Sequence, residues 1–367
     1  MFDFSADFLT PGAAVSHAIF AVMLCAFSAV LTRWVIRWNI ADVPNARSSH
    51  AQPTPKSGGV AIAISFLAGM VVILSVHEEA PVPDVPFAIF LAMIGVTFAA
   101  ALADDLIELA PFIKLFCQLA AALVFSLFVA RIDGLAVPMI GNLTFGWFGH
   151  LVTIGWFVLF MNVYNFMDGL DGLAAGGALI ALFMLGGIGL ILGAHVVYLS
   201  ALCLFAAVAG FFAFNFPPAK IFMGDTGSQV IGFVIAGLAV IGARGDVGQI
   251  SIVVVPALFS CFIVDVAATL LYRFFRKQPL TQAHREHLFQ ICNRLGFSHL
   301  RLSLIYYGLF LVSGAGAVLL QFADAAARLP LFISGLLVYV PLAVMVYLAG
   351  MARGVVTLTA TPQQDQP

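Results

Sequence analysis

The chain has 367 residues, of which 62% are hydrophobic and only 9% are charged, and its mean hydropathy is +1.07. Soluble domains contain about 45–50% apolar and about 25% charged residues, so this composition excludes an ordinary soluble protein and predicts a membrane protein. The formal net charge of −2 carries little information in a membrane protein, because the placement of the basic residues along the chain matters more. We expect no nucleic-acid partner.

Apolar runs divided by charged or Pro- and Gly-rich breaks predict about eleven membrane-spanning helices. A spanning helix needs about 20 apolar residues, because lipid offers no partner for backbone polar groups. The predicted segments are approximately 15–36, 59–76, 87–103, 112–130, 147–165, 173–193, 196–214, 228–242, 250–272, 302–321 and 330–349. We therefore expect an all-α polytopic membrane protein, with one integral membrane domain over 1–350 and a polar cytoplasmic tail over 351–367.

The basic residues predict how the chain is threaded through the membrane. With the N-terminus in the periplasm, thirteen of the sixteen Lys and Arg residues fall on the cytoplasmic side, and only Arg131, Arg244 and Arg328 fall outside. Cytoplasmic loops carry such an excess of basic residues, and an odd number of helices then leaves the C-terminus in the cytoplasm. The polar-rich stretches all share the cytoplasmic face, where we expect any active site: 40–58, 104–111, 165–172, 215–228 and 273–301.

Two adjacent carboxylates, Asp104 and Asp105, end the third apolar run, and Glu108 follows one helical turn after Asp104. Carboxylates this close repel one another at a membrane boundary, so they either have raised pKa values or gather a cation. The pair indicates a divalent-ion site, a general base, or both, and an ordinary solvated helix end is the alternative. Lys114 begins the next run, where an isolated lysine is more often an interface residue than a phosphate ligand.

Asn or Asp recurs at every third position through Asn162, Asn165, Asp168 and Asp171, across the end of a predicted spanning segment. In one continuous helix this row would turn around the axis by about 60° per step. Glycines after Asp168 and Asp171 are expected to break the helix and to let amide and carboxylate oxygens aim at one ligand. Such oxygen donors suit magnesium with phosphate, and polar groups at this depth are costly unless they are used.

The stretch Phe222-Met223-Gly224-Asp225-Thr226-Gly227-Ser228 forms a short re-entry between two apolar runs. Its glycines allow close approach of the backbone, and Asp225 and Thr226 supply oxygens just before a new helix N-terminus, a favourable place for phosphate. The alternative is an Asp that only caps the helix, but this does not explain why the stretch shares a face with the other acidic groups.

The loop that precedes the second apolar run combines Arg47, His50 and Lys56 with a flexible diglycine. This composition favours an anion. The same residues also fit a proline turn with ordinary cytoplasmic basic residues, and taken alone they favour that second interpretation.

His284 and His287 lie one turn apart, with Arg285 between them, if the most basic loop is helical. A zinc site is disfavoured because no cysteine pair and no third imidazole are close in the sequence, so binding of a diphosphate by His and Arg is the better interpretation. Asp265, inside the preceding apolar segment, is costly without a partner, and the sequence assigns it no role.

Together these five stretches resemble the polyprenyl-phosphate N-acetylhexosamine-1-phosphate transferase superfamily, which includes the enzymes that initiate O-antigen, enterobacterial-antigen and teichoic-acid synthesis and the peptidoglycan lipid I translocase. The resemblance runs from about Asp42 to His287 and includes Asn-x-x-Asn-x-x-Asp-Gly-Leu-Asp-Gly-Leu-Ala and Phe-Met-Gly-Asp-Thr-Gly-Ser. It implies a multi-pass enzyme of the bacterial inner membrane that moves N-acetylhexosamine-1-phosphate from a UDP-sugar to undecaprenyl phosphate and releases UMP.

The resemblance also implies roles for individual residues. Asp104 or Asp105 would be the base, and Asn165 and Asp225 would bind Mg²⁺, or Mn²⁺ in its place. Asp171 and Phe222 would contact uridine, with Phe222 stacked on the base, and the two histidines would hold the diphosphate together with Arg285. The complete predicted site has Asp104, Asp105 and Asp168 as catalytic residues, Asn165 and Asp225 as metal ligands, and Arg47, His50, Lys56, Lys114, Asn162, Asp171, Phe222, His284, Arg285 and His287 as substrate-binding residues.

One departure from the superfamily pattern concerns the sugar. Relatives that start on N-acetylglucosamine, and the peptidoglycan translocase, tend to carry further histidines in the last loop, whereas Leu288-Phe289-Gln290 follows His287 here. The chain therefore looks more like the O-antigen initiators that use modified N-acetylhexosamines. It also lacks a long charged insertion of the kind that a muramyl-pentapeptide donor would suggest.

Two other classes of protein are alternatives to an enzyme. A secondary transporter would place its acidic groups halfway along the helices, and an inactive lipid-binding relative would have lost carboxylates from its motifs. Here the acidic groups cluster at predicted cytoplasmic helix ends and every motif keeps its carboxylates, which favours an enzyme. The sequence leaves a homodimer open.

Overall fold

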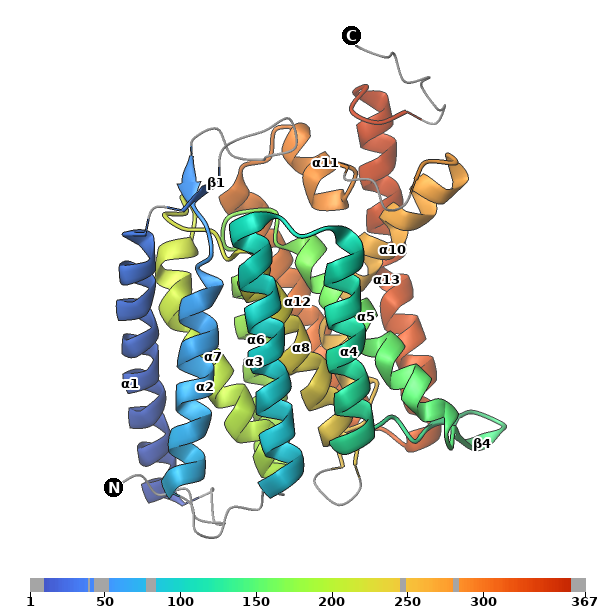
Figure 1. The fold of residues 1–367 in the computed structure, drawn as a ribbon. Helices are drawn as coiled ribbons and strands as arrows, with labels where there is room; N and C mark the ends of the chain where they lie inside the picture. Colours follow the sequence, from blue (N-terminus) through green and yellow to red (C-terminus); the bar gives the residue numbers. More distant parts are fainter. Residues whose placement is uncertain are drawn as a thin grey trace.

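The computed structural model describes residues 10–38, 40–42, 53–76, 84–244, 249–279 and 284–357, which form a bundle of roughly upright helices (Figure 1). The helices are α1 (Pro11–Ile36), α2 (Gly59–Val76), α3 (Asp84–Ile107), α4 (Pro111–Phe128), α5 (Phe148–Met167), α6 (Leu173–Ile191), α7 (His195–Asn215), α8 (Gly224–Gly242), α9 (Val254–Leu258), α10 (Ser260–Phe275), α11 (Leu288–Arg294), α12 (His299–Phe322) and α13 (Ala325–Ala352). The strands form two antiparallel pairs, β1 (Ala41–Asp42) with β2 (Thr54–Pro55) and β3 (Gly134–Val137) with β4 (Gly141–Thr144).

All eleven predicted segments overlap helices, and the segment predicted over 250–272 is divided between two of them. Phe259 separates α9 from α10 because its backbone leaves helical geometry, at φ −101° and ψ 20°. Within the described ranges, nine helices are long and apolar enough to cross a membrane, and α2 adds a shorter apolar helix. The prediction of an all-α polytopic membrane protein is confirmed.

Helix α8 forms the centre of the bundle. All its residues from Thr226 to Gly242 are buried, whereas only four of the 28 residues of α13 are. Aromatic rings of α3, α4 and α5 surround it. Their centroids lie 6.1, 6.3 and 4.8 Å from the ring of Phe233, for Phe90, Phe125 and Phe157 respectively. Because such rings bury large apolar areas, they hold these three helices in fixed positions around α8.

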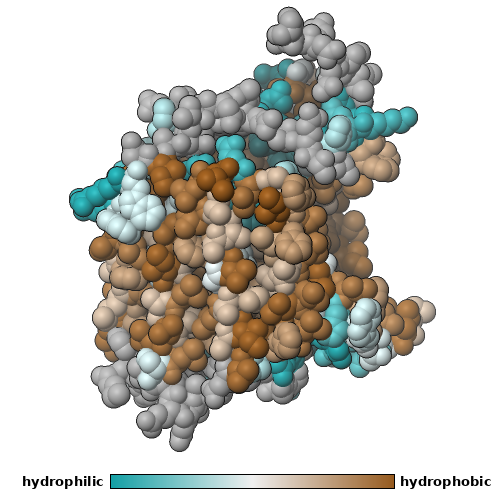
Figure 2. Space-filling view, viewed as in Figure 1, coloured by the Kyte–Doolittle hydropathy of each residue, from teal (hydrophilic) through white to brown (hydrophobic). Residues whose placement is uncertain are grey.

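The sides of the bundle are apolar. Figure 2 shows hydrophobic side chains over the middle of the molecule and hydrophilic ones toward its two ends. Large apolar side chains point outward there, including Val22, Phe116 and Leu319, each about 70% exposed. In water this surface would be a severe cost, whereas lipid covers it without one.

Candidate active site at the helix ends

The end of α3 meets the beginning of α8, and Asp105 makes the connection. Its carboxylate accepts hydrogen bonds from the backbone N–H groups of Asp225 (3.0 Å) and Thr226 (3.1 Å) and from the Thr226 hydroxyl (2.5 Å). These N–H groups have no partner within α8, so Asp105 acts as the cap of a helix far away in the sequence. Gly224 has φ +72°, and a Cβ there would lie 2.6 Å from the Asp105 carboxylate, which explains the glycine.

Asp104 and Asp225 share one cation, Lys114. The ammonium group of Lys114, at the start of α4, forms ion pairs with Asp104 and, at 3.1 Å, with Asp225. The backbone N–H of Leu109 donates to the other oxygen of Asp104 at 2.8 Å. Asp104 is only 6% exposed, so this lysine is a bound partner of the carboxylates and not a free interface residue.

Helix α5 brings Asn165 and Asp168 to the same place. The Asn165 amide donates to Asp225 Oδ1 (2.9 Å) and to the Ser228 hydroxyl (2.8 Å). Asp168 follows at the end of α5, where desolvation, and then the negative charges of Asp225 and Asp105, raise its pKa to about 8. The structure therefore gathers Asp104, Asp105, Lys114, Asn165, Asp168 and Asp225, which we call the carboxylate cluster.

The donors in the carboxylate cluster suit a hard divalent cation. Among the described residues, no three side chains of His, Cys, Asp or Glu form a metal cage on their own. Magnesium does not need one, because it usually takes one or two protein carboxylates and completes its shell with water and substrate phosphates. The Asp225 carboxylate and the neighbouring Asp168 offer such oxygens. The Asn165 amide, whose nitrogen donates to Asp225 here, would turn its oxygen toward the ion to complete the set.

Asn162 lies one turn deeper and does not face the carboxylate cluster directly. Its amide donates to Gln118 Oε1 (2.9 Å), and Gln118 in turn donates to Gln229 Oε1 (2.9 Å). A small cavity of about 30 Å³ connects the amides of Gln118 and Gln229 to Asp104 and Lys114 and is also lined by Thr97. The structure thus assigns Asn162 to a buried amide network below the cluster, and its predicted contact with substrate is not tested.

The predicted nucleotide contacts lie on an adjoining turn. Asp171 accepts from the backbone N–H of Ala219 (3.1 Å) and pairs with His299 (3.2 Å). Desolvation disfavours the ionised form of Asp171, but the contacts with His299 and Ala219 outweigh it and lower the pKa of Asp171 below its usual value. Asp171 thereby fixes the turn that leads to Phe222, whose side chain is partly exposed.

Lys56 reaches the same turn through backbone pairing. The N–H of Phe222 donates to Pro55 O at 2.8 Å, and the N–H of Gly58 donates back to Phe222 O at 2.9 Å. This places Lys56, which follows β2, beside the Phe222 segment. Arg47 and His50 belong to the same loop but lie outside the described residues, so their role stays a prediction.

The loop that carries His284, Arg285 and His287 lies over the end of α5. The rings of His284 and His287 are 5.0 Å apart, and the His287 ring lies 5.9 Å from that of Phe166, the neighbour of Asn165. Desolvation, and then the nearby His287 and Arg273, lower the pKa of His284 to about 4, so His284 is neutral at pH 7. The histidine-rich loop therefore lies beside the row of Asn and Asp residues at the end of α5.

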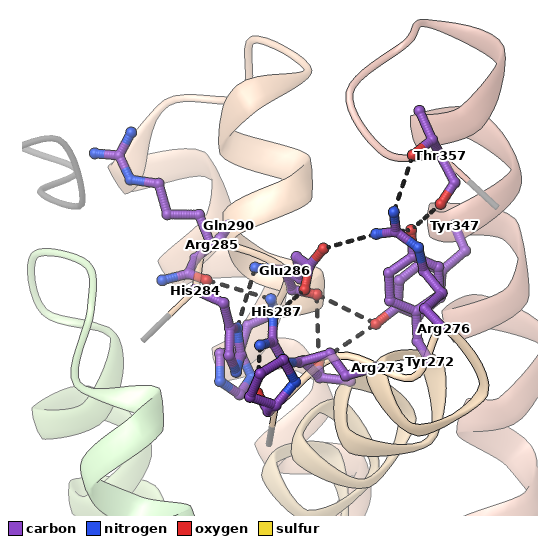
Figure 3. Close-up of polar contacts among 12 residues, drawn as sticks. Tyr272, Arg273, Arg276, His284, Arg285, Glu286, His287, Gln290, Tyr347 and Thr357 are labelled. Atoms are coloured by element: carbon purple, nitrogen blue, oxygen red, sulfur yellow. Dashed lines mark hydrogen bonds and ion pairs between the residues drawn. The ribbon is translucent and has the colours of Figure 1, made fainter. Parts of the chain in front are cut away.

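Glu286, to which the sequence assigns no role, holds this loop in place (Figure 3). Its carboxylate forms ion pairs with Arg273 (2.5 Å) and Arg276 (3.2 Å) at the end of α10, and its backbone carbonyl accepts from the Tyr347 hydroxyl of α13 (3.2 Å). The acidic residue between the histidines thus anchors the loop to two helices. A Glu between two His is a weak signal in sequence, because its partners lie ten or more residues away.

Asp265 acquires a role that the sequence did not assign. This fully buried carboxylate contacts His287 Nδ1 (3.1 Å) and accepts from the backbone N–H of Leu288 (2.9 Å) and from the Tyr306 hydroxyl (2.5 Å). A carboxylate hydrogen-bonded to one ring nitrogen of a histidine fixes the orientation of the imidazole and decides which nitrogen carries the proton. Asp265 is therefore a positioning residue for His287 and caps α11.

The fold and the site define a multi-pass membrane protein with an acidic site where several helices end. Residues 87–243 match the glycosyl transferase family 4. The chain is 30% identical over 310 residues to the "Probable undecaprenyl-phosphate N-acetylglucosaminyl 1-phosphate transferase" of Bacillus subtilis. This match covers 84% of each of the two chains. It is 30% identical to the "Decaprenyl-phosphate N-acetylglucosaminephosphotransferase" of Mycobacterium tuberculosis over 82% of this chain and 81% of that one.

A shorter match, 30% identical, relates the chain to a "Phospho-N-acetylmuramoyl-pentapeptide-transferase" of Limosilactobacillus fermentum over 56% of this chain and 62% of that one. The chain belongs to the glycosyl transferase family 4, and the resemblance found in the sequence is confirmed. It is a multi-pass protein of the bacterial inner membrane.

Proposed function

We propose that this protein transfers N-acetylhexosamine-1-phosphate from a UDP-sugar to undecaprenyl phosphate, which yields undecaprenyl-diphosphate-sugar and UMP. The observation that carries the proposal is the carboxylate cluster, in which Asp104, Lys114 and Asp225 are in mutual contact at the ends of three helices. The activities named for the relatives from Bacillus subtilis and Mycobacterium tuberculosis support the same reaction.

In the proposed mechanism, Asp104 accepts the proton of the lipid phosphate. The freed phosphate oxygen attacks the phosphorus bound to the sugar, a new P–O bond forms, and the bond to the uridine-linked phosphate breaks with UMP as leaving group. Asp104 is the better candidate for the base, because it lines the small cavity beside Lys114, whereas the carboxylate of Asp105 caps the beginning of α8. The Lys114 ammonium, placed between Asp104 and Asp225, would hold a phosphate oxygen near both.

We propose Mg²⁺, or Mn²⁺ in its place, as the cofactor, with Asp225 and Asn165 as its protein ligands. Such an ion, when bound, neutralises diphosphate charge and polarises the phosphoryl oxygens. Phosphoryl transfer needs little covalent help from the protein, so positioning and electrostatics supply most of the barrier reduction. Asp168 beside these ligands would add negative charge or, when protonated, a hydrogen-bond donor.

The other end of the donor would lie along the turn that Asp171 fixes. Phe222, partly exposed and paired with the Lys56 segment, offers a ring for stacking on uracil. His287, oriented by Asp265, and the neighbouring Arg285 would hold the diphosphate from the opposite side. His284 would serve as a neutral hydrogen-bonding group.

A substrate panel tests this function most directly. Purified protein in detergent would be incubated with Mg²⁺, radiolabelled undecaprenyl phosphate and each of several UDP-N-acetylhexosamines, and the lipid products would be separated. We expect one or more donors to give a lipid-linked sugar diphosphate together with equimolar UMP. Absence of product from every donor, with a protein that still binds undecaprenyl phosphate, would contradict the proposal.

The same panel decides the sugar. The relatives' names point to N-acetylglucosamine, whereas Leu288-Phe289-Gln290, in place of further histidines after His287, favours a modified N-acetylhexosamine of the kind that O-antigen initiators use. We propose the modified hexosamine as the preferred donor and the start of a cell-envelope polysaccharide such as O-antigen as the role. Turnover of UDP-N-acetylglucosamine above that of all modified donors would overturn this choice.

A further inference from the structure

The chain turns back on itself directly after α13. Gly354 has φ +68°, a left-handed conformation that ends many helices and reverses the direction of the chain. The backbone N–H groups of Val355 and Val356 then donate to Gly350 O, at 2.8 and 3.3 Å. Residues 354–357, which we call the C-terminal clasp, therefore lie against the last turn of α13.

Val356 packs the C-terminal clasp onto α11. Its side chain is only 5% exposed and belongs to a small apolar cluster. The other buried members of this cluster are Leu288, Ile291, Ala343 and Tyr347. A Cβ on Gly350 would lie 2.8 Å from Val356 Cγ2 and 3.0 Å from Ile291 Cγ2, so the glycine leaves room for this contact. Because α11 begins directly after His287, the clasp supports the helix that follows the two histidines.

Thr357 connects the C-terminal clasp to the histidine-rich loop through Arg276. The guanidinium of Arg276 donates to Thr357 Oγ1 from Nη2 and to Glu286 Oε1 from Nη1, both at 3.2 Å, and so bridges the two segments (Figure 3). The Tyr272 hydroxyl donates to the backbone oxygen of Thr357 at 2.6 Å, and the Tyr272 ring stacks on that of Tyr347, with centroids 4.6 Å apart. Since the Tyr347 hydroxyl donates to Glu286 O, two routes join the clasp to the residue between the histidines.

The histidine-rich loop is thus held from two directions. Asp265, in the interior of α10, contacts His287, whereas the C-terminal clasp supports Glu286 and α11 from the side of α13. A binding group that is ordered before its ligand arrives loses less conformational freedom when the ligand binds. The clasp therefore favours one fixed arrangement of the side chains on this loop.

We infer that the C-terminal clasp positions the histidine-rich loop for the diphosphate of the nucleotide-sugar donor. The inference rests on the proposed function, in which His287 and Arg285 hold that diphosphate. Val356 and Thr357 are positioning residues, because they act through α11 and Glu286. The clasp contacts α10, α11 and α13, whereas the carboxylate cluster is built on α3, α4, α5 and α8, so loss of the clasp should weaken binding of the donor and spare the lipid acceptor.

Two matched pairs of variants test the C-terminal clasp. In the first pair, one chain ends at Gly354 and lacks the contacts of the clasp, and the other ends at Thr359 and keeps them. In the second pair, Val356→Asp places a charge in the apolar cluster, and Arg353→Gln alters an exposed residue of the same turn. Both substitutions lower the net charge by one, so they differ in the contact that they break.

Binding and turnover of the purified variants in detergent are compared with wild type. We expect the chain ending at Gly354 and Val356→Asp to bind UDP with Mg²⁺ about tenfold more weakly in calorimetry, and KM for the UDP-sugar to rise by a similar factor. Their kcat and their KM for undecaprenyl phosphate should stay within about twofold of wild type, because the carboxylate cluster is intact. Hydrogen exchange of the α11 amides should become faster in the same two variants. The chain ending at Thr359 and Arg353→Gln should match wild type.

The outcomes separate this inference from the function on which it rests. A wild type that binds no UDP contradicts the proposed function. A wild type that binds UDP, with unchanged affinity in both disrupted variants, overturns the role of the C-terminal clasp and leaves the function standing. Equal losses of affinity for UDP and for undecaprenyl phosphate also overturn it, because the clasp would then only stabilise the fold.

Discussion

At the scale of single residues, two neighbouring carboxylates have different surroundings. Asp105 has both oxygens occupied by the beginning of α8, whereas Asp104 faces Lys114 and the small cavity beside the cluster. The sequence Asp-Asp could not separate them, because the difference comes from which helix each side chain meets. The structure favours a structural role for Asp105 and a chemical one for Asp104.

This difference predicts opposite effects of substitution. Asp104→Asn keeps the shape of the side chain but removes the base, so we expect kcat to fall by about 10²- to 10⁴-fold with little change in Tm. Asp105→Ala leaves two backbone N–H groups without a partner, so unfolding should become easier by about 1–3 kcal/mol. Steady-state UMP release and thermal unfolding of both variants check this, and a normal kcat for Asp104→Asn would remove it from the mechanism.

Asp265 gives a second prediction at this scale. Asp265→Asn should loosen the orientation of His287 and lower kcat/KM for the UDP-sugar by up to about 100-fold, mainly through KM, since small misplacements of a binding group are costly. Tyr306→Phe is the matched control, because it removes one donor to the same carboxylate and leaves His287 in contact. If the two variants lose stability alike and KM stays normal in both, Asp265 is only structural.

Residue identity was more predictable than residue partnership. The acidic and amide side chains of the carboxylate cluster could be chosen from local spacing and resemblance, and the structure brings most of them together. The contacts of Asp265 with His287 and of Glu286 with Arg273 could not, because they depend on how α10, α11 and α13 pack. Nor could the amide network of Asn162 with Gln118 be predicted, since it joins α5 to α4, and the predicted contact of Asn162 with substrate stays a prediction.

At the scale of elements, the site depends on two helix beginnings that almost touch. A Cβ on Gly59, the first residue of α2, would lie 1.9 Å from the backbone nitrogen of Gly227 in α8. Adjacent backbone bonds from Gly58 and Gly59 to the Phe222 segment hold this contact. The diglycine of the basic loop is therefore a packing requirement between α2 and α8.

We accordingly expect Gly59→Ala to push α2 away from α8 and to destabilise the protein by about 1–3 kcal/mol, as overpacking does. Activity should fall with it, because Lys56 and Phe222 belong to the same junction. Gly95→Ala in α3 is the control: nothing lies within 4 Å of its Cβ position, and stability should stay level or rise. A Tm of Gly59→Ala equal to that of Gly95→Ala would disprove the contact.

Helix boundaries show where sequence reasoning about elements stops. Apolar runs located the helices well, because lipid exposure demands continuous hydrophobicity. The break at Phe259 carries no such signal, since the apolar run continues through it. A single residue leaving helical geometry inside a hydrophobic stretch is a consequence of packing and does not show in composition.

At the scale of the whole molecule, the apolar belt separates two polar ends, one with the carboxylate cluster and one with Arg131, Arg244 and Arg328. The asymmetry of basic residues predicts that the carboxylate end faces the cytoplasm. The end of α13 lies at the same end of the bundle as the carboxylate cluster, and the cytoplasmic tail stays a prediction.

Labelling of introduced cysteines checks this orientation. Asn142→Cys in the exposed β4 strand should react with a membrane-impermeant maleimide added to intact spheroplasts, whereas Arg294→Cys in α11 should react only after lysis. Wild-type protein provides the background of the native cysteines. The reverse labelling pattern would place the carboxylate cluster in the periplasm, away from any cytoplasmic UDP-sugar.

The metal dependence of turnover tests the central claim, a divalent cation held by Asp225 and Asn165 within the carboxylate cluster. UMP release by purified wild type and Asp225→Ala would be measured across a Mg²⁺ titration, with undecaprenyl phosphate and the preferred UDP-sugar at saturation. We expect wild-type turnover to require the ion and Asp225→Ala to lose at least about 10²-fold in kcat at saturating Mg²⁺, since electrostatic stabilisation is the largest contribution. Near-normal turnover of Asp225→Ala would contradict the account.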